Sequence, residues 1–321
     1  MPDFFHNGAG RLRSLWRLAV FAVAYFFAVN ALFLAAEFGL ALVLPRPAYE
    51  WLLFKSSLAL VIQSVIIYAP AAAVGWGCGL MLEDLPWRAL GWALHKGWLR
   101  DALFGLLVGG ASVCAAAAAG RVFGGYSFAF PPEFHAAAVL RTLAVSGVVF
   151  ALGAAAEEML FRGYPLQTLM RSWPIAAALV VGSVCFGLVH LQNPNVVPGF
   201  TFVNTLLAGA WLAVAYWRTR SLWFPLGAHA GWNWVQGALL GSPVSGITSI
   251  TPAPLLRFAD AGPLWVGGGD YGIEGGAACT LALALSTLFI WRTRLLSATP
   301  DMRQYTDGEN PNPESPRITQ P

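Results

Sequence analysis

Long apolar runs recur along the chain and limit its fold more than any other feature of the sequence. A helix needs about 20 mostly apolar residues to cross a hydrocarbon layer of about 30 Å. Eight runs approach or exceed that length, at residues 18–44, 57–82, 102–120, 140–170, 174–190, 200–217, 222–240 and 275–291. Residues 18–44 do not alternate between apolar and polar positions as a membrane-spanning strand does. The sequence therefore predicts an all-α fold, a polytopic bundle of about eight transmembrane helices.

The composition agrees with lipid as the solvent. Of the 321 residues, 57% are hydrophobic and only 11% are charged, too few charges to cover a soluble globule of this size. The net charge of +3 is too small to indicate a nucleic-acid partner. The lipid bilayer is therefore an expected partner of this chain, and nucleic acid is not.

Lysine and arginine are unevenly divided between the two sets of helix ends. Eleven belong to the set that includes both termini, and five belong to the other set. Positive residues are retained on the cytoplasmic side of a membrane. We therefore expect a multi-pass protein of the cell (inner) membrane with both termini in the cytoplasm.

The first polar motif inside an apolar run is Glu157-Glu158 followed by Arg162. A charge at the centre of a bilayer helix costs about 2.5–3.5 kcal/mol, so these residues indicate a polar site between helices. Residues four apart share a helix face, which predicts a Glu158–Arg162 pair and leaves Glu157 on a different face. An unpaired carboxylate in an apolar site suits a general base, because burial destabilises its ionised form. A buried ionic lock between helices is the alternative interpretation.

Two further motifs carry imidazoles, namely Phe186-Gly-Leu-Val-His190 and His229-Ala-Gly-Trp-Asn233. His229 and Asn233 are four residues apart, so one helix would present both side chains to the same cavity. An imidazole and an amide together are suited to holding an oxyanion. His190 taken alone is equally well explained by a hydrogen bond to a neighbouring helix. Together, the motifs predict an active site between helices.

Zinc is a second chemistry open to these residues. Glu157, His190 and His229 could supply three ligands and leave a position for water. The motif HExxH is absent, so the ligands would have to converge from three helices. The sequence permits a zinc ion without requiring one, and we favour a site without a cofactor.

The ordered set Glu157-Glu158-x-x-x-Arg162, Phe186-x-x-x-His190 and His229-x-x-x-Asn233 resembles the CAAX-processing and bacteriocin-processing (CPBP) intramembrane proteases, which include the type II CAAX prenyl endopeptidases. All three motifs match in order, within about residues 140–240. The resemblance implies a hydrolase that cuts membrane-associated protein or peptide substrates, with CAAX-type C-terminal processing as one form of that activity. It is compatible with a glutamate protease and with a metalloprotease.

The resemblance also implies a role for each matching residue. Glu157 would activate water as the base, and His190 would help to hold that water. The oxyanion would be stabilised by His229 and Asn233. Supporting roles would belong to Glu158 and Arg162.

Two functions other than proteolysis stay open on the residues alone. A protein of the same fold could serve as a membrane scaffold, an immunity factor or a regulator of another membrane protein. Intramembrane acids also mark ion paths, which leaves a transporter as a third hypothesis. The intact motif set favours the protease.

The runs and motifs together divide the chain. We expect a cytoplasmic N-terminal segment at residues 1–17, three spans in 18–139, a catalytic core of four spans in 140–240, a Gly/Pro-rich extracytoplasmic loop at 241–274, a last span at 275–296 and a disordered cytoplasmic tail at 297–321. One feature fits straight upright helices poorly, because His190 and His229 would then differ in depth by about 13 Å at 1.5 Å per residue. A tilted or broken helix, or a different boundary near Pro174, is expected to close that gap.

Overall fold

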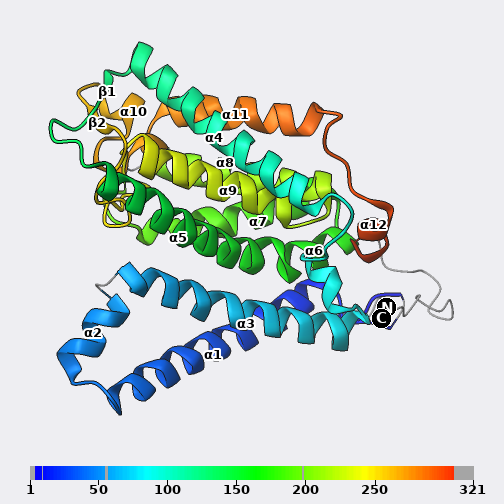
Figure 1. The fold of residues 1–321 in the computed structure, drawn as a ribbon. Coiled ribbons are helices and arrows are strands. Elements are labelled where there is room, and N and C mark those ends of the chain that lie inside the picture. The colour runs from blue at the N-terminus through cyan, green and yellow to red at the C-terminus, as the bar shows by residue number, and fades with distance from the viewer. Residues whose placement is uncertain (1–3, 9, 55–56, 197–198, 307–321) are drawn as a thin grey trace.

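The computed structural model describes residues 4–8, 10–54, 57–196 and 199–306 (Figure 1). Its longer helices are α1 (Ser14–Ala41), α3 (Ser57–Glu83), α4 (Trp98–Phe123), α5 (Ala136–Arg162), α7 (Ile175–Val189), α8 (Phe200–Thr219), α9 (Trp223–Trp234) and α11 (Ala277–Arg292). Its shorter elements are α2 (Arg46–Phe54), η1 (Trp87–Leu90), β1 (Tyr126–Ala129), α6 (Tyr164–Ser172), η2 (His190–Gln192), η3 (Val235–Leu239), β2 (Arg257–Asp260), α10 (Leu264–Gly267), η4 (Gly269–Tyr271), η5 (Ile273–Gly275) and α12 (Pro300–Thr306).

The predicted all-α bundle is confirmed. By length and apolar composition, six helical segments of the described residues are able to cross a membrane. The other two expected spans coincide with shorter helices, namely α11 and the combination of α9 with the π-helical turn η3. The chain is a multi-pass membrane protein.

The helices form two groups that meet along α3 and α5 (Figure 1). α1 and α3 pack against each other, and α3 in turn packs against α5. In the larger group α9 lies centrally and contacts α4, α5 and α8, while α7 packs on α8 and α11 packs on both α4 and α8. The motif-bearing helices α5, α7 and α9 therefore lie next to one another inside the bundle.

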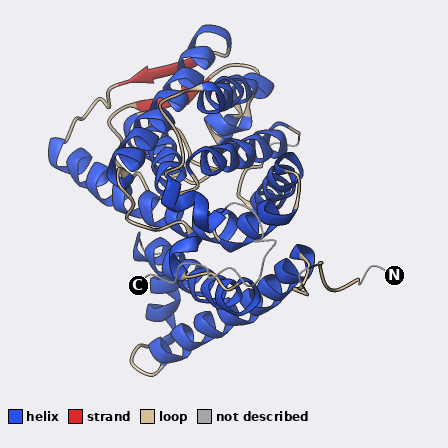
Figure 2. Cartoon of the chain, turned by 90° about the vertical axis from the view of Figure 1, so that its right-hand side faces the viewer, coloured by secondary structure: helices blue, strands red, loops and turns tan. Residues whose placement is uncertain are grey.

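A short antiparallel sheet joins two connections at one end of the larger group. Tyr126 in β1 pairs with Asp260 in β2, and the Tyr126 hydroxyl donates a hydrogen bond of 2.7 Å to the carbonyl of Gly267. Figure 2 shows the two strands at the periphery of a molecule that is otherwise helices and loops. The sheet thus ties the connection after α4 to the segment at residues 241–274.

Glycines bring α4 and α9 into unusually close contact. A Cβ at Gly109 of α4 would collide with the carbonyl of Ala228, and one at Gly231 of α9 would collide with the carbonyl of Leu106. Small residues at the crossing let two helix backbones approach closely in a membrane protein. This packing places α9, with its motif residues, firmly against α4.

One expected boundary is wrong, because the run at residues 140–170 is not a single helix. It breaks at Gly163, where α5 ends and α6 begins. Pro165 at the second position of α6 has no backbone N–H, and its ring would clash with the carbonyl four residues earlier in a continuous helix. The chain therefore turns directly after Arg162, and α6 is largely buried against its neighbours.

The expectation of a disordered tail from residue 297 is also wrong in part. Residues 300–306 form α12, which packs near η1 and α6. Met302 is fully buried, and Arg220 donates a hydrogen bond to the carbonyl of Thr306. One buried apolar residue and one side-chain contact hold a segment whose composition predicted no structure. The remaining tail, residues 307–321, lies outside the described residues.

Candidate active site

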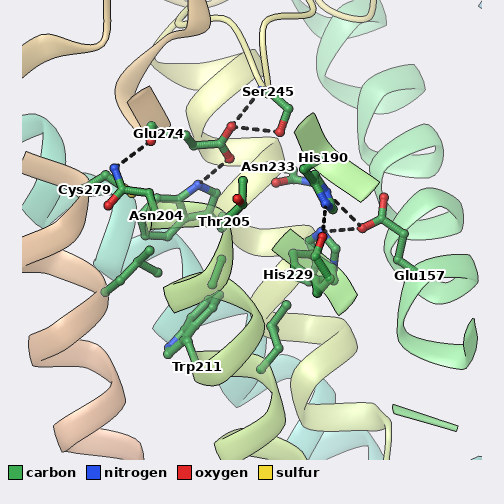
Figure 3. A pocket seen from close by; sticks show the side chains of 15 residues that line it. Glu157, His190, Asn204, Thr205, Trp211, His229, Asn233, Ser245, Glu274 and Cys279 are labelled. Atoms are coloured by element: carbon green, nitrogen blue, oxygen red, sulfur yellow. Dashed lines mark hydrogen bonds and ion pairs between the residues drawn. The ribbon is translucent and has the colours of Figure 1, made fainter. Parts of the chain in front are cut away.

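The three sequence motifs converge on one cavity (Figure 3). Glu157 comes from α5, His190 from the start of η2 directly after α7, and both His229 and Asn233 from α9. All four side chains line the cavity, whose empty space of about 560 Å³ is partly open to solvent. The structure therefore brings together the four residues that the sequence analysis selected as candidate catalytic groups.

Behind the cavity wall lies a buried charged group. Glu158 is 0% exposed and accepts a hydrogen bond of 3.1 Å from Arg162 Nη1, which is the predicted pair. The same Oε1 atom lies 3.0 Å from His229 Nδ1. Arg162 also donates to the carbonyl of Gly209 in α8. Glu158 thus links the guanidinium to the imidazole and fixes the orientation of His229.

The surroundings of Glu157 differ from those of Glu158. Its side chain is 34% exposed and points into the cavity, and its Oε2 atom lies 3.7 Å from His190 Nε2 and 3.9 Å from His229 Nε2. That oxygen is buried and accepts no hydrogen bond from the described residues. Polar atoms at 3.7–3.9 Å are too far apart for a direct hydrogen bond, and a water molecule can bridge such separations.

His190 is oriented by its own helix. Its Nδ1 atom lies 2.7 Å from the carbonyl of Phe186, which can only accept a hydrogen bond. Nδ1 therefore carries the proton, and Nε2 faces Glu157. The Phe186 ring also packs on the guanidinium of Arg162, 4.3 Å from its centroid. Phe186 is thereby placed between the charged group and His190, which accounts for its position in the motif.

The depth difference expected between the two histidines is removed by the position of α9. Its first turn does not begin at the surface of the protein, because Ser221 and Leu222 are fully buried. The Leu222 N–H donates to the carbonyl of Gly91, and the Ser221 hydroxyl bonds with His95. The segment around η1 covers the start of α9, so counting residues from that start underestimates the depth of His229.

A second cavity adjoins the first. It has a volume of about 830 Å³ and lies between α3, α5 and the residues that follow α9. Four residues line both cavities, namely Glu157, His190, Asn233 and Ser245. Its other lining residues are mainly apolar, with Ile67, Val149, Phe150 and Ile247 among them. The candidate base therefore lies where the two cavities meet.

The sequence analysis missed two residues of the site, Ser245 and Glu274. Both belong to the 241–274 segment, for which no role was expected, and both line the 560 Å³ cavity. Their signal in the sequence is weak, because a single Glu at the end of a Gly-rich loop has no spacing that relates it to Glu157. Asn204 of α8 donates to the carbonyls of Glu274 and Gly276 and so holds this segment in place.

The donor types around Glu157 would suit a zinc ion, since zinc binds imidazole nitrogen and carboxylate oxygen. Among the residues that the structure describes, however, no three His, Cys, Asp or Glu side chains are arranged to hold a metal. A site without a cofactor stays a prediction.

Comparison with known proteins finds a similarity over the segment that carries the site. Residues 138–235 match the family model described as type II CAAX prenyl endopeptidase Rce1-like. The chain is also similar to the "Uncharacterized protein YyaK" of Bacillus subtilis (strain 168), with 31% identity over 105 residues. That alignment covers 32% of this chain and 35% of the relative. The matched segment runs from α5 to η3 and contains all three motifs. Residues 138–235 are therefore similar to the type II CAAX prenyl endopeptidase Rce1-like family, in the part of the chain that carries the candidate site.

Proposed function

We propose that this protein is an intramembrane endopeptidase that hydrolyses a peptide bond with a water molecule activated by Glu157. The observation that carries the proposal is the buried Oε2 atom of Glu157, which lacks a hydrogen-bond donor and lies within 4 Å of two imidazole nitrogens. A water molecule there would have a carboxylate to accept its proton and a histidine to fix its position.

The proposed reaction has two stages. Glu157 takes a proton from water while the water oxygen bonds to the carbonyl carbon of the substrate. The carbonyl oxygen becomes an oxyanion, which Asn233 and a protonated His229 Nε2 stabilise by donating hydrogen bonds. Glu158, at Nδ1 of His229, balances the charge of that imidazolium. The proton held by Glu157 then passes to the leaving nitrogen as the C–N bond breaks.

The substrate class follows from the position of the site. The cavities lie among helices of a multi-pass membrane protein, so a substrate attached to the bilayer reaches them most directly. The apolar side chains that line the second cavity, between α3 and α5, suit an apolar part of such a protein or peptide. CAAX-type C-terminal processing is one activity within this proposal. We place the protein in the cell membrane with both termini in the cytoplasm, on the arginine and lysine distribution.

Substitution of the base tests the proposal. Protein reconstituted in liposomes is incubated with a panel of lipid-anchored and prenylated peptides, and the cleavage products are identified by mass spectrometry. We expect Glu157→Gln to lower kcat/KM by about 10²–10⁴-fold, the usual contribution of a general base. Glu133→Gln, which makes the same change on an exposed connection, is the matched control.

The same assay separates the alternatives. Cleavage that is lost in Glu157→Gln and retained with a zinc chelator supports the glutamate mechanism, whereas loss in both supports a metallopeptidase. Equal cleavage by the wild type and Glu157→Gln contradicts the assignment of the base. An absence of cleavage across the panel favours a non-proteolytic scaffold.

A further inference from the structure

Glu274 is a carboxylate of the cavity that the family motifs do not include. It lies in η5, outside the matched residues 138–235, and reaches the cavity from the 241–274 segment. Figure 3 shows it across the cavity from Glu157, with His190, His229 and Asn233 between the two carboxylates. Its position gives it access to a substrate that occupies the cavity.

Neutral donors fix the Glu274 carboxylate. Oε2 accepts hydrogen bonds of 2.6 Å from the Ser245 N–H and 2.9 Å from the Ser245 hydroxyl, and Oε1 accepts one of 3.1 Å from Trp232 Nε1. Ser245 and Gly246 both have positive φ, 49° and 79°, as in the tight turns that join paired strands. The turn aims two donors of one residue at a single oxygen. Donation to both oxygens suits the ionised form.

No cation is paired with this carboxylate among the ion pairs of the described residues. Around the two imidazoles there are three carboxylates, Glu157, Glu158 and Glu274, and one guanidinium, Arg162. Glu158 is already paired with Arg162. Even with His229 protonated, the three carboxylates outnumber the two cations, so the site is negative overall, and the charge on the far side of the cavity belongs to Glu274. A cavity of one charge sign concentrates ligands of the opposite sign.

We propose that Glu274 is a specificity-determining residue that receives the positively charged side chain, Lys or Arg, of a peptide substrate beside the scissile bond. This inference rests on the proposed peptidase function. Glu274 selects among substrates by charge, and it disfavours substrates that place a carboxylate in the cavity. A purely structural role, in which Glu274 only anchors Ser245 and Trp232, would affect all substrates equally.

The test uses lipid-anchored peptides that differ only in having Lys, Ala or Glu at one position, scanned over both sides of the cleaved bond. For the wild type in liposomes, we expect one scanned position at which kcat/KM is about 10–100-fold higher for the Lys peptide than for the Ala peptide. This is the range for a hydrogen bond to a charged group. Glu274→Gln should reduce that ratio to near one. Asp270→Asn, which removes an exposed charge four residues away in the same segment, should keep the ratio.

Binding provides a second readout that does not need turnover. In the Glu157→Gln background, affinities of the same labelled peptides are measured in nanodiscs, with and without Glu274→Gln. A Lys preference that Glu274→Gln removes supports the proposal. Equal binding or cleavage of the three peptides, or a Lys preference that survives Glu274→Gln, overturns it. Cleavage without charge preference refutes this inference alone, whereas charge-selective binding without cleavage refutes the peptidase function alone.

Discussion

Glu157 and Glu158 are adjacent in the sequence and approach opposite nitrogens of His229 from different surroundings. Successive residues of a helix point about 100° apart, so one carboxylate enters the cavity and the other lies behind it. Glu158 is 0% exposed and bonded through Oε1 to Arg162 and His229, while Glu157 is 34% exposed and lies 3.7 Å and 3.9 Å from the two imidazoles. The Oε2 atom of each carboxylate accepts no hydrogen bond from the described residues. The motif therefore places one carboxylate behind the cavity wall and the other in the cavity, where we propose that it acts as the base.

Removal of Arg162 should be severely destabilising. Arg162→Met leaves Glu158 as a buried charge without its guanidinium partner, and we expect a loss of about 3–5 kcal/mol in the free energy of unfolding. The double variant Glu158→Gln/Arg162→Met should lose less, because no unpaired charge remains. Chemical unfolding in detergent measures both. Arg46→Met, which breaks an exposed pair with Glu50, is the control and should change little. Equal losses in the single and double variants would contradict this account.

The charge preference assigned to Glu274 should depend on pH. Burial is the main cause that raises the pKa of Glu274, and the hydrogen bonds from Ser245 and Trp232 oppose it. A raised pKa means that protonation neutralises Glu274 at a higher pH than an ordinary carboxyl. The Lys-over-Ala ratio should therefore be largest at neutral or higher pH and fall on acidification. Among the titratable neighbours, His190 faces it from η2 and Tyr271 from η4. The ratio of kcat/KM for the two peptides, measured across pH, checks this, and a pH-independent ratio would contradict it.

At the scale of elements, the site depends on how closely α9 packs on α4. The spacing Gly105-x-x-x-Gly109 in α4 and Gly227-x-x-x-Gly231 in α9 places small residues on the facing sides of both helices. His229 lies between the two glycines of α9. Any change that separates the helices therefore moves a residue that contacts Glu158.

A single methyl group tests this packing. Gly109→Ala places a Cβ against the carbonyl of Ala228, and we expect a loss of about 1–3 kcal/mol in stability together with reduced activity. Gly77→Ala makes the same substitution in α3, where a Cβ meets nothing within 4 Å. Thermal unfolding in detergent compares the two. If Gly109→Ala were as stable as Gly77→Ala, the close contact would not be needed.

For the whole molecule, the arrangement of helix ends gives a testable topology. Positive residues gather on the side of the termini, so that side should face the cytoplasm and the 241–274 segment should face outward. In a variant without its native cysteines, Ser249→Cys should react with an impermeant thiol reagent in intact cells. Asp301→Cys in α12 should react only after permeabilisation. The reverse pattern would contradict the orientation. Both positions are exposed.

The sequence alone determined the membrane class, the approximate positions of the apolar helices apart from the break at Gly163, and the four motif residues that share a cavity. Apolar run length and the cost of charges in lipid are local properties, and a spacing of four fixes which residues share a helix face. These constraints also predicted the Glu158–Arg162 pair, which the structure contains.

Only the tertiary structure decided how the site is closed. The break at Gly163, the covered start of α9 and the return of Ser245 and Glu274 to the cavity all depend on contacts between segments far apart in the chain. Such contacts leave no periodic pattern in the sequence, because each joins residues of two elements whose separation along the chain is not set by helix geometry. The sequence motifs thus predict the residues on one side of the cavity. The residues on the other side, Ser245 and Glu274, are identified only by the tertiary structure.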